Sequence, residues 1–586
     1  MTESRYITPF LLIFFLAFNF NMESSAQQTP FERQPHTTAT YHEVIEHYQQ
    51  LAAAYPQARL LSYGSTDFGK PLHLLVLARD KEFDPIKIRN NHKTVLLINN
   101  GIHPGEPEGI DASMMLARDL LKKNTIPDNV VICIIPVYNI DGIFNRTGTS
   151  RANQNGPDAY GFRGNSKNYD LNRDFIKTDS RNSRTFQQIF NIWQPEVFVD
   201  THTSNGADYQ YTMTLIPTHK DKLQKTLSAY LTGNMIPSLY ADMKKVGYEM
   251  IPYVNSIEES PDAGITGFLE SPRYSTGYAA LHNTIGFMPE THMLKAYDKR
   301  VDATYKLLET YVGLVSRDAE IIRKNKIQAD LEVAAQQEFD IEWKLNKEQA
   351  EPLEFKGYAA KEKTSEVSGF KRLYYDRAAP YTKNINYWNN FVPSVTISKP
   401  IAYIIPKAWE SIVELLKLNK VKVQQLAKDA QLPVEMYYIG DFKTSSSPYE
   451  GHYLHSAVQL QSKQQNITFY EGDYIVYVNQ TVNRYIIETL EPQATDSFFN
   501  WNFFDSILSM KEHFSAYVFE DTAAELLRRD PALREQLEQK KADSPAFAKD
   551  GAAQLDFVYK NSEYYEPTHL RYPVARLINN TPLSIK

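Results

Sequence analysis

The sequence predicts an α/β fold in which a largely parallel sheet is covered by helices on both faces. Four short apolar runs have strand length, and each ends in polar residues: 95–98, 130–137, 197–199 and 285–288. Stretches with helical patterns lie between them, including 183–193 and 220–243. Strands that alternate with helices are typical of a sheet whose connections cover it, and buried parallel strands are apolar throughout.

Composition excludes several classes of protein. The chain has 586 residues, more than one typical core holds, so two or three domains are expected. Hydrophobic residues at 42% and charged residues at 23% are ordinary for a globular protein and argue against disorder. Net charge is −7, and Lys and Arg are spread along the chain, so no nucleic-acid partner is expected. Cys133 is the single cysteine and lies in the apolar run VVICIIPV, which predicts a buried hydrophobe.

The N-terminus predicts export. Residues 9–20, PFLLIFFLAFNF, have the length of a signal-peptide core and are too short to span a bilayer comfortably. Ser24, Ser25 and Ala26 follow, so we expect a signal peptide over 1–26 with cleavage after Ala26. A retained anchor is the alternative. The mature chain has no other run long enough for a stable membrane span, and a periplasmic or extracellular location is expected.

Metal-binding residue types follow three of the predicted strands. His103 and Glu106 lie in a rigid turn between the strand 95–98 and a helix that we expect to begin at Pro107. His202 and Glu290 each come just after another strand. Ligands of such sheets bind beyond the carboxyl ends of the strands, where these side chains converge. Two imidazoles and a carboxylate suit a zinc ion.

A second cluster of histidine and glutamate lies on the predicted helix 41–54. His42 and His47 are five residues apart, which is about 140° around a helix, so they cannot share a metal ion. We expect both at the surface.

Residues 40–316 resemble the zinc carboxypeptidase family related to carboxypeptidase A. The resemblance depends on NNGIHPGEPEG, VYNIDGI, NYDLNRDF, FVDTHTS and GFMPETH, in that order. It implies a mixed sheet and one catalytic zinc ion per chain, with His103, Glu106 and His202 as ligands and an open position for water. Zinc lowers the pKa of bound water toward about 7. Glu290 would be the general base.

The same resemblance assigns residues that surround the zinc. Arg163 would stabilise the oxyanion, although Arg151 competes for this role and a loop salt bridge is the alternative for Arg163. Asn172 and Arg173 would hold the terminal carboxylate of the substrate, because an arginine fork donates two parallel hydrogen bonds. Asp170 would orient a ligating histidine, or alternatively cap a turn.

The family's substrate-clamping tyrosine has no clear counterpart. Tyr274 and Tyr278 lie closer to Glu290 than the family pattern expects. Either could cover the cleft, and both could instead be packing aromatics. His292 could be a core or cleft histidine and is not assigned to the metal.

The family motifs stop after residue 316, which sets the predicted domains. We expect a catalytic domain over 36–316, a helical connector over 317–350 and an α/β or α+β accessory domain over 351–586. Within the accessory domain the patterns predict a strand at 402–405, a helix at 409–418 and a strand at 421–423. His452 and His455 are expected at its surface.

Three functions follow from the sequence. The first is a zinc metallocarboxypeptidase that hydrolyses the C-terminal amide bond of peptides or of cell-wall peptides. The second is a zinc-dependent deacylase of an acylated amino acid. The third is a non-catalytic peptide-binding relative.

Overall fold

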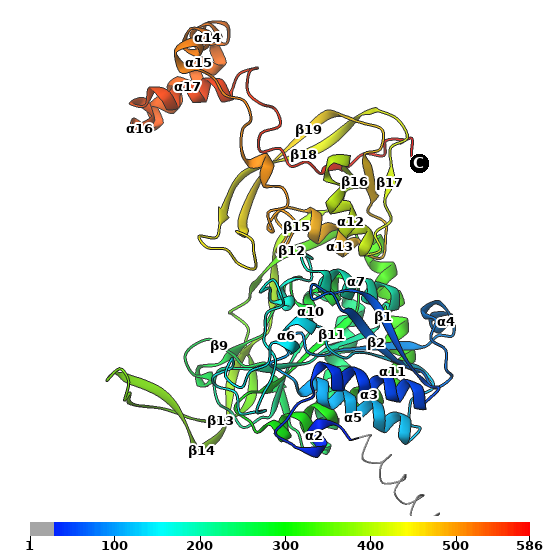
Figure 1. Ribbon diagram of the computed structural model, residues 1–586. Helices are drawn as coiled ribbons and strands as arrows, with labels where there is room; N and C mark the ends of the chain where they lie inside the picture. Colours follow the sequence, from blue (N-terminus) through cyan, green and yellow to red (C-terminus); the bar gives the residue numbers. More distant parts are fainter. Residues whose placement is uncertain (1–27) are drawn as a thin grey trace, which may run out of the picture.

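A computed structural model describes residues 28–586 of the chain. The expected signal peptide, 1–26, lies outside the described residues. Figure 1 shows a sheet-and-helix body, a second sheet above it, and a small group of helices at the far end. The body, residues 28–398, is called the catalytic half after its expected function. Within 28–586, no helix is both long and apolar enough to cross a membrane.

The central sheet has nine strands and is mixed, as expected. Its middle strands run parallel to one another: β3 pairs in parallel with β4 and with β5, and β5 pairs in parallel with β11. The pairs β1–β2, β2–β4 and β11–β7 are antiparallel. In spatial order, with β6 (His202–Ser204) paired to β11, the strands are β1 (Ala58–Ser65), β2 (Pro71–Leu77), β4 (Val130–Ile135), β3 (Thr94–Asn99), β5 (Val197–Asp200), β11 (Ile285–His292), β7 (Met213–Pro217) and β8 (Met250–Pro252).

Helices cover both faces of this sheet. On one face, α11 (Tyr297–Ala335) packs against α5 (Glu108–Lys122), β3 and β4, and α3 (Tyr41–Ala54) packs against α5 (Figure 1). On the other face, α7 (Arg181–Trp193) contacts β1 and β2, and α10 (Ser275–Leu281) contacts β5 and β11. The buried Cys133 lies in β4, as expected.

The expected surface position of His47 on α3 is wrong. His47 is buried, and its Nε2 lies 3.1 Å from the carbonyl oxygen of Met114 on α5. Burial lowers the pKa of His47. The five-residue spacing that prevents His42 and His47 from sharing a metal places one of them outside and the other against α5.

The expected helical connector, 317–350, is helical only in its first part. The helix α11 begins inside the predicted catalytic domain and continues unbroken to Ala335, packed on the central sheet, so it is a structural helix of the body. The strand β12 (Glu338–Leu345) then pairs with β15 (Phe391–Ser398). The long hairpin of β13 (Glu351–Thr364) and β14 (Lys371–Trp388) also belongs to the catalytic half, because β14 pairs with β10 (Ile265–Thr266).

The first strand of the accessory sheet along the chain is β16 (Ala402–Ile405), which matches the expected strand at 402–405, and the helix α12 (Glu410–Leu418) follows it. Residues 421–423 form no strand, since the pairing starts at β17 (Gln424–Gln425). All its strand pairs are antiparallel. Its other elements are β18 (Ala430–Thr444), β19 (His455–Phe469), β20 (Tyr474–Tyr477), α13 (Asn483–Leu490) and β21 (Ala575–Leu577).

A separate group of four helices lies between α13 and β21 in the sequence. Its helices share a small core of their own, which includes Phe519, Leu533 and Tyr559. Figure 1 shows the group projecting away from the two sheets. It consists of α14 (Ala516–Arg529), α15 (Pro531–Asp543), α16 (Pro545–Ala548) and α17 (Gly551–Lys560).

The accessory sheet is held on the catalytic half by buried polar contacts. The side chain of Asn419, at the end of α12, accepts from the hydroxyl of Tyr278 at 2.6 Å and donates to Gln187 at 2.9 Å. Arg273 forms an ion pair with the buried Asp496. Because polar groups buried in an interface need their partners, these contacts fix how the two halves dock.

Candidate active site

A turn between β3 and α5 delivers His103 and Glu106. The strand ends at Asn99 and the helix begins at Glu108, with Pro107 as the residue that precedes its first turn. The start of α5 lies against the strand end that carries His202. A Cβ on Gly109 would lie 1.9 Å from Thr201 Oγ1, so only glycine allows this approach.

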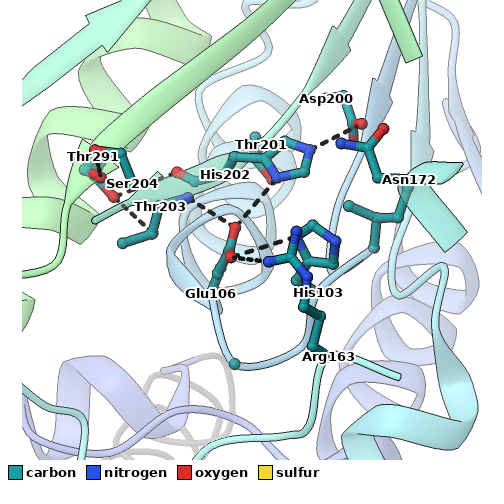
Figure 2. A network of polar contacts seen from close by, with 12 residues as sticks. His103, Glu106, Arg163, Asn172, Asp200, Thr201, His202, Thr203, Ser204 and Thr291 are labelled. Carbon is teal, nitrogen blue, oxygen red and sulfur yellow. Dashed lines mark hydrogen bonds and ion pairs between the residues drawn. The ribbon is translucent and has the colours of Figure 1, made fainter. Parts of the chain in front are cut away.

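His103, Glu106 and His202 converge in the buried centre of the site. Their candidate ligand atoms all lie within 4.8 Å of one another. Glu106 lies between the two rings: Oε1 is 3.3 Å from Nδ1 of His103, and Oε2 is 3.2 Å from Nδ1 of His202. The backbone N–H of Thr203 donates to Glu106 Oε2 at 2.8 Å and holds the carboxylate in place. Figure 2 shows the three side chains pointing toward one another.

Each histidine uses its other ring nitrogen to contact a carboxylate. Nε2 of His103 lies 2.8 Å from Asp170 Oδ1, and Nε2 of His202 lies 3.0 Å from Asp200 Oδ2. A hydrogen donated from Nε2 leaves a lone pair on Nδ1, which faces the centre of the site.

The residues present fit a zinc ion. Nδ1 of His103 is buried and has no hydrogen-bond partner among the described residues, which is costly unless something else occupies its lone pair. Zinc–ligand bonds of about 2.0–2.2 Å require ligand atoms about 3–4 Å apart, close to the distances between Glu106 and the two rings. Two neutral imidazoles and one carboxylate leave a fourth position open, as in catalytic zinc sites.

Two arginines contact the carboxylate of Glu106. Arg151 donates from Nη1 to Oε1 at 2.7 Å, and Arg163 lies 3.4 Å from the same oxygen. Burial opposes ionisation of Glu106, but the charges of Arg151 and His103 outweigh it and hold its pKa well below the usual value. Burial likewise disfavours a charged His202, and the carboxylates of Asp200 and Glu106 reverse this and raise its pKa well above normal. The centre therefore keeps Glu106 ionised.

Glu290 lies within β11, although its position was expected just after the strand. The strand continues to His292 because β6 and β7 pair with its second half, and Glu290 stands directly opposite His202 of β6. The Glu290 carboxyl forms no hydrogen bond with any described residue. Burial, reinforced by the nearby charge of Glu106 and opposed by that of His202, raises its pKa to about 8. A carboxyl group tuned in this way can take and return a proton.

Asp170 joins the metal-binding centre to a second cationic group. Its Oδ1 contacts His103, and its Oδ2 accepts from Arg163 Nε at 2.9 Å and lies 3.9 Å from Nη1 of Arg173. The guanidinium of Arg173 lies over the ring of Tyr274, 4.3 Å from its centroid. Asn172 is buried next to them, and its side-chain oxygen accepts from the N–H of Ser275.

The two tyrosine candidates have different surroundings. Tyr274 contacts Arg173 and lies at the site. Tyr278 is fully buried in the core, where its hydroxyl contacts Asn419, so it is the packing aromatic of the two alternatives and cannot cover a substrate. His292 is also a core residue, because it is buried and its Nε2 lies 2.9 Å from the carbonyl oxygen of Ala207.

Three residues at the site were missed by sequence reasoning. Asp200 had a usable pattern, because residues two apart on a strand share a face and Asp200 therefore lies beside His202. Glu270 is buried near Asp200 and His202, and burial raises its pKa to about 8, yet no motif marks it. Tyr449 comes from the accessory sheet and contacts Arg173. His452 was expected at the surface, and it contacts Asp179. The expected surface position of His455 is wrong, because this residue is buried.

Part of the chain is similar to known proteins. Residues 44–245 match the zinc carboxypeptidase family, Peptidase M14. Carboxypeptidase 2 of Trichophyton tonsurans is 23% identical over 467 residues, which cover 75% of this chain and 79% of that protein. Probable carboxypeptidase 2 of Arthroderma benhamiae is 23% identical over 428 residues, covering 70% of this chain and 75% of that protein.

Solved structures also align with the chain over about half its length. Carboxypeptidase A from Helicoverpa armigera aligns with 15% identity and a TM-score of 0.37, over 49% of this chain and 74% of that one. A metallo-carboxypeptidase from Burkholderia cenocepacia aligns with 15% identity and a TM-score of 0.35, over 48% of this chain and 70% of that one.

Proposed function

Residues 44–245 match the zinc carboxypeptidase family, and on this premise we propose that the chain is a zinc carboxypeptidase that removes the last residue of peptides that end in a free carboxylate. The substrate class includes cell-wall peptides with such an end. The apolar run 9–20 supports export, so these substrates would be met in the periplasm or outside the cell.

Each group has a defined task in this proposal. His103, Glu106 and His202 would hold a zinc ion, which would supply Lewis-acid chemistry to polarise the scissile carbonyl and to acidify a water molecule. Glu290 takes the proton of the attacking water and gives it to the leaving amine as the C–N bond breaks. Arg163 faces the same centre and stabilises the negative charge that develops on the carbonyl oxygen.

The contacts of Asp170 carry the proposal. A single carboxylate touches His103 of the metal-binding centre at one oxygen and lies beside Arg173 at the other. A cation suited to a carboxylate is therefore held at a fixed position next to the hydrolytic centre. This arrangement favours cleavage of the bond next to a chain end, because the terminal carboxylate and the scissile bond are only one residue apart.

The test replaces Glu290 by Gln. The variant keeps the size of the side chain and removes its ability to accept a proton, so kcat on a free-acid peptide should fall about 10²–10⁴-fold. Zinc content, measured by elemental analysis, should stay at one ion per chain. Glu46→Gln changes an exposed glutamate and serves as the control. Full activity of Glu290→Gln would contradict the proposed role.

A panel of substrates distinguishes the peptidase from a deacylase. Both activities could use Arg173 to hold a carboxylate. The panel contains peptides and acylated amino acids, each with a free and with an amidated carboxyl group. We expect peptides with free ends to be cleaved fastest, whereas cleavage of acylated amino acids alone would favour the deacylase.

A further inference from the structure

A loop of the accessory sheet enters the candidate active site. Residues 445–454 connect β18 and β19, whose yellow strands lie in the upper sheet of Figure 1. Two of its residues contact the groups around the metal-binding centre, from about 280 positions further along the chain. None of the residues assigned above to zinc binding or proton transfer comes from this half of the molecule.

The tip of the loop is a tight, well-defined turn. Tyr449 and His452 exchange backbone hydrogen bonds of 2.7 and 3.0 Å, with Glu450 and Gly451 between them. Both central residues have positive φ, 51° and 85°, as a two-residue type I′ hairpin turn requires. A Cβ at Gly451 would lie 3.1 Å from the ring of Tyr169, so the turn packs closely on the catalytic half.

Glu450 attaches this turn to the residue that orients a metal ligand. Its Oε2 accepts from the backbone N–H of Asp170 at 2.7 Å. The side chain of Asp170 in turn contacts His103. His452 adds a second attachment, since its Nε2 lies 2.8 Å from Asp179. The loop is therefore fixed against the site at two points.

Tyr449 completes the surroundings of Arg173. Nε of Arg173 donates to the hydroxyl oxygen of Tyr449 at 2.8 Å, while Nη1 donates to the carbonyl oxygen of Asn172. Because the phenol oxygen accepts this bond, its own hydrogen remains available to donate. Nη2 of Arg173 has no hydrogen bond to any described residue. Arg173 and Tyr449, which contact each other, thus each keep one donor without a partner among the described residues, and both donors suit the oxygens of a carboxylate.

The position of Tyr449 is itself supported from behind. The guanidinium of Arg273 lies 5.4 Å from the centroid of the Tyr449 ring and 4.9 Å from that of Trp501. The buried carboxylate of Asp496 accepts hydrogen bonds from the backbone N–H and from the guanidinium of Arg273 and so holds Arg273 in place. Tyr449 is only partly buried, in contrast to the fully buried Tyr278.

We propose that Tyr449 binds the terminal carboxylate of the substrate together with Arg173, and that the accessory domain is therefore part of the active site. The phenol O–H donates to one carboxylate oxygen, and Nη2 of Arg173 donates to the other. The loop 445–454 closes the site at this end, which suits a substrate whose chain stops there. This inference rests on the proposed recognition of a free carboxylate.

The test compares Tyr449→Phe with Tyr453→Phe in the full-length zinc enzyme. Tyr453 lies on the same loop, is half exposed, and its hydroxyl contacts no described residue, so it is a matched control. Tyr449→Phe removes one hydrogen bond to a charged group, so KM for a free-acid peptide should rise about 10- to 100-fold. We expect kcat to change less than about threefold and zinc content to stay at one ion, because neither the metal ligands nor Glu290 is touched.

A second substrate separates the possible failures. An amidated peptide offers no carboxylate, so Tyr449→Phe and the wild type should cleave it equally slowly. An unchanged KM for the free acid in Tyr449→Phe would overturn the role of Tyr449 while leaving the proposed function intact. Parallel losses on both peptides, or loss of zinc, would show a merely structural role and also overturn it. A wild-type enzyme without preference for free acids would instead refute the proposed function and this inference with it.

Discussion

Each metal-binding histidine is oriented by a carboxylate from a different segment of the chain. Asp170 comes from a short turn and contacts His103, whereas Asp200 ends β5 and contacts His202. Asp200 is fully buried, and its other oxygen accepts from the side chain of Asn99 at 2.8 Å. Such partners fix the ring orientation and make the ligand nitrogen more basic.

Replacing Asp200 by Asn should weaken zinc binding. The amide cannot supply the negative charge that faces Nε2 of His202, so the zinc dissociation constant should rise about 10- to 100-fold. Competition with a chromogenic chelator measures this constant. Asp128→Asn provides a control, because the side chain of Asp128 is 84% exposed. Equal affinities of Asp200→Asn and the wild type would contradict the orienting role.

At the scale of elements, a buried ion pair joins the start of α5, which follows the metal-binding turn, to α11. Glu108, the first residue of α5, pairs with Nε of Arg300 on α11, and both side chains are buried. The second oxygen of Glu108 accepts from the hydroxyl of Thr203 at 2.7 Å. Arg300 also donates to four backbone carbonyls, among them that of Met293 just after β11. One network of hydrogen bonds and an ion pair therefore joins the starts of α5 and α11 to the ends of β6 and β11.

Arg300→Met should destabilise the protein strongly. It leaves Glu108 buried without its partner and several carbonyls without a donor, which costs about 3–5 kcal/mol of unfolding free energy. Urea denaturation of the zinc-loaded protein measures the change. Lys324→Met, on the exposed side of the same helix, removes a surface pair with Glu320 and should have no measurable effect. Comparable losses in the two variants would argue against the network.

At the scale of the whole molecule, the two halves share a buried surface that contains an uncharged histidine. His282 lies between the rings of Tyr278 and Tyr485, one from each half. Burial, together with the charge of Lys326, lowers its pKa to about 3. The unfolded chain would protonate this residue near pH 6.5. Below that pH the unfolded state binds the extra proton, so stability falls as pH falls.

Removal of this histidine should flatten the dependence of stability on pH. Between about pH 6 and pH 4, His282 should cost about 1.4 kcal/mol of unfolding free energy for each unit of acidification. The variant His282→Gln lacks this contribution, so its stability relative to the wild type should improve steadily as pH falls. Urea unfolding at several pH values measures both, with the exposed His42→Gln as the control. Parallel curves for wild type and His282→Gln would contradict the assignment.

Much of the catalytic half was predictable because its information is local. Apolar runs revealed the strands, and the turn 103–106 follows directly from a strand and precedes a helix. The order of the strands along the chain placed His103, His202 and Glu290 at one edge, and the resemblance to zinc carboxypeptidases named the metal. The strand β12 inside the expected helical connector and the burial of His47 were missed because periodicity does not tell which neighbour will cover a face.

The sequence by itself determined the metal-binding residue types and the strands that carry them, and its resemblance to zinc carboxypeptidases supplied the expected chemistry. Only the tertiary structure decided which groups surround them: the contact of Asp200 with His202, that of Arg151 with Glu106, and that of Tyr449 with Arg173. The physical reason is distance along the chain. Arg173 and Tyr449 are 276 positions apart. Their hydrogen bond forms only because the accessory sheet docks on the catalytic half through buried polar contacts, which no local sequence pattern encodes.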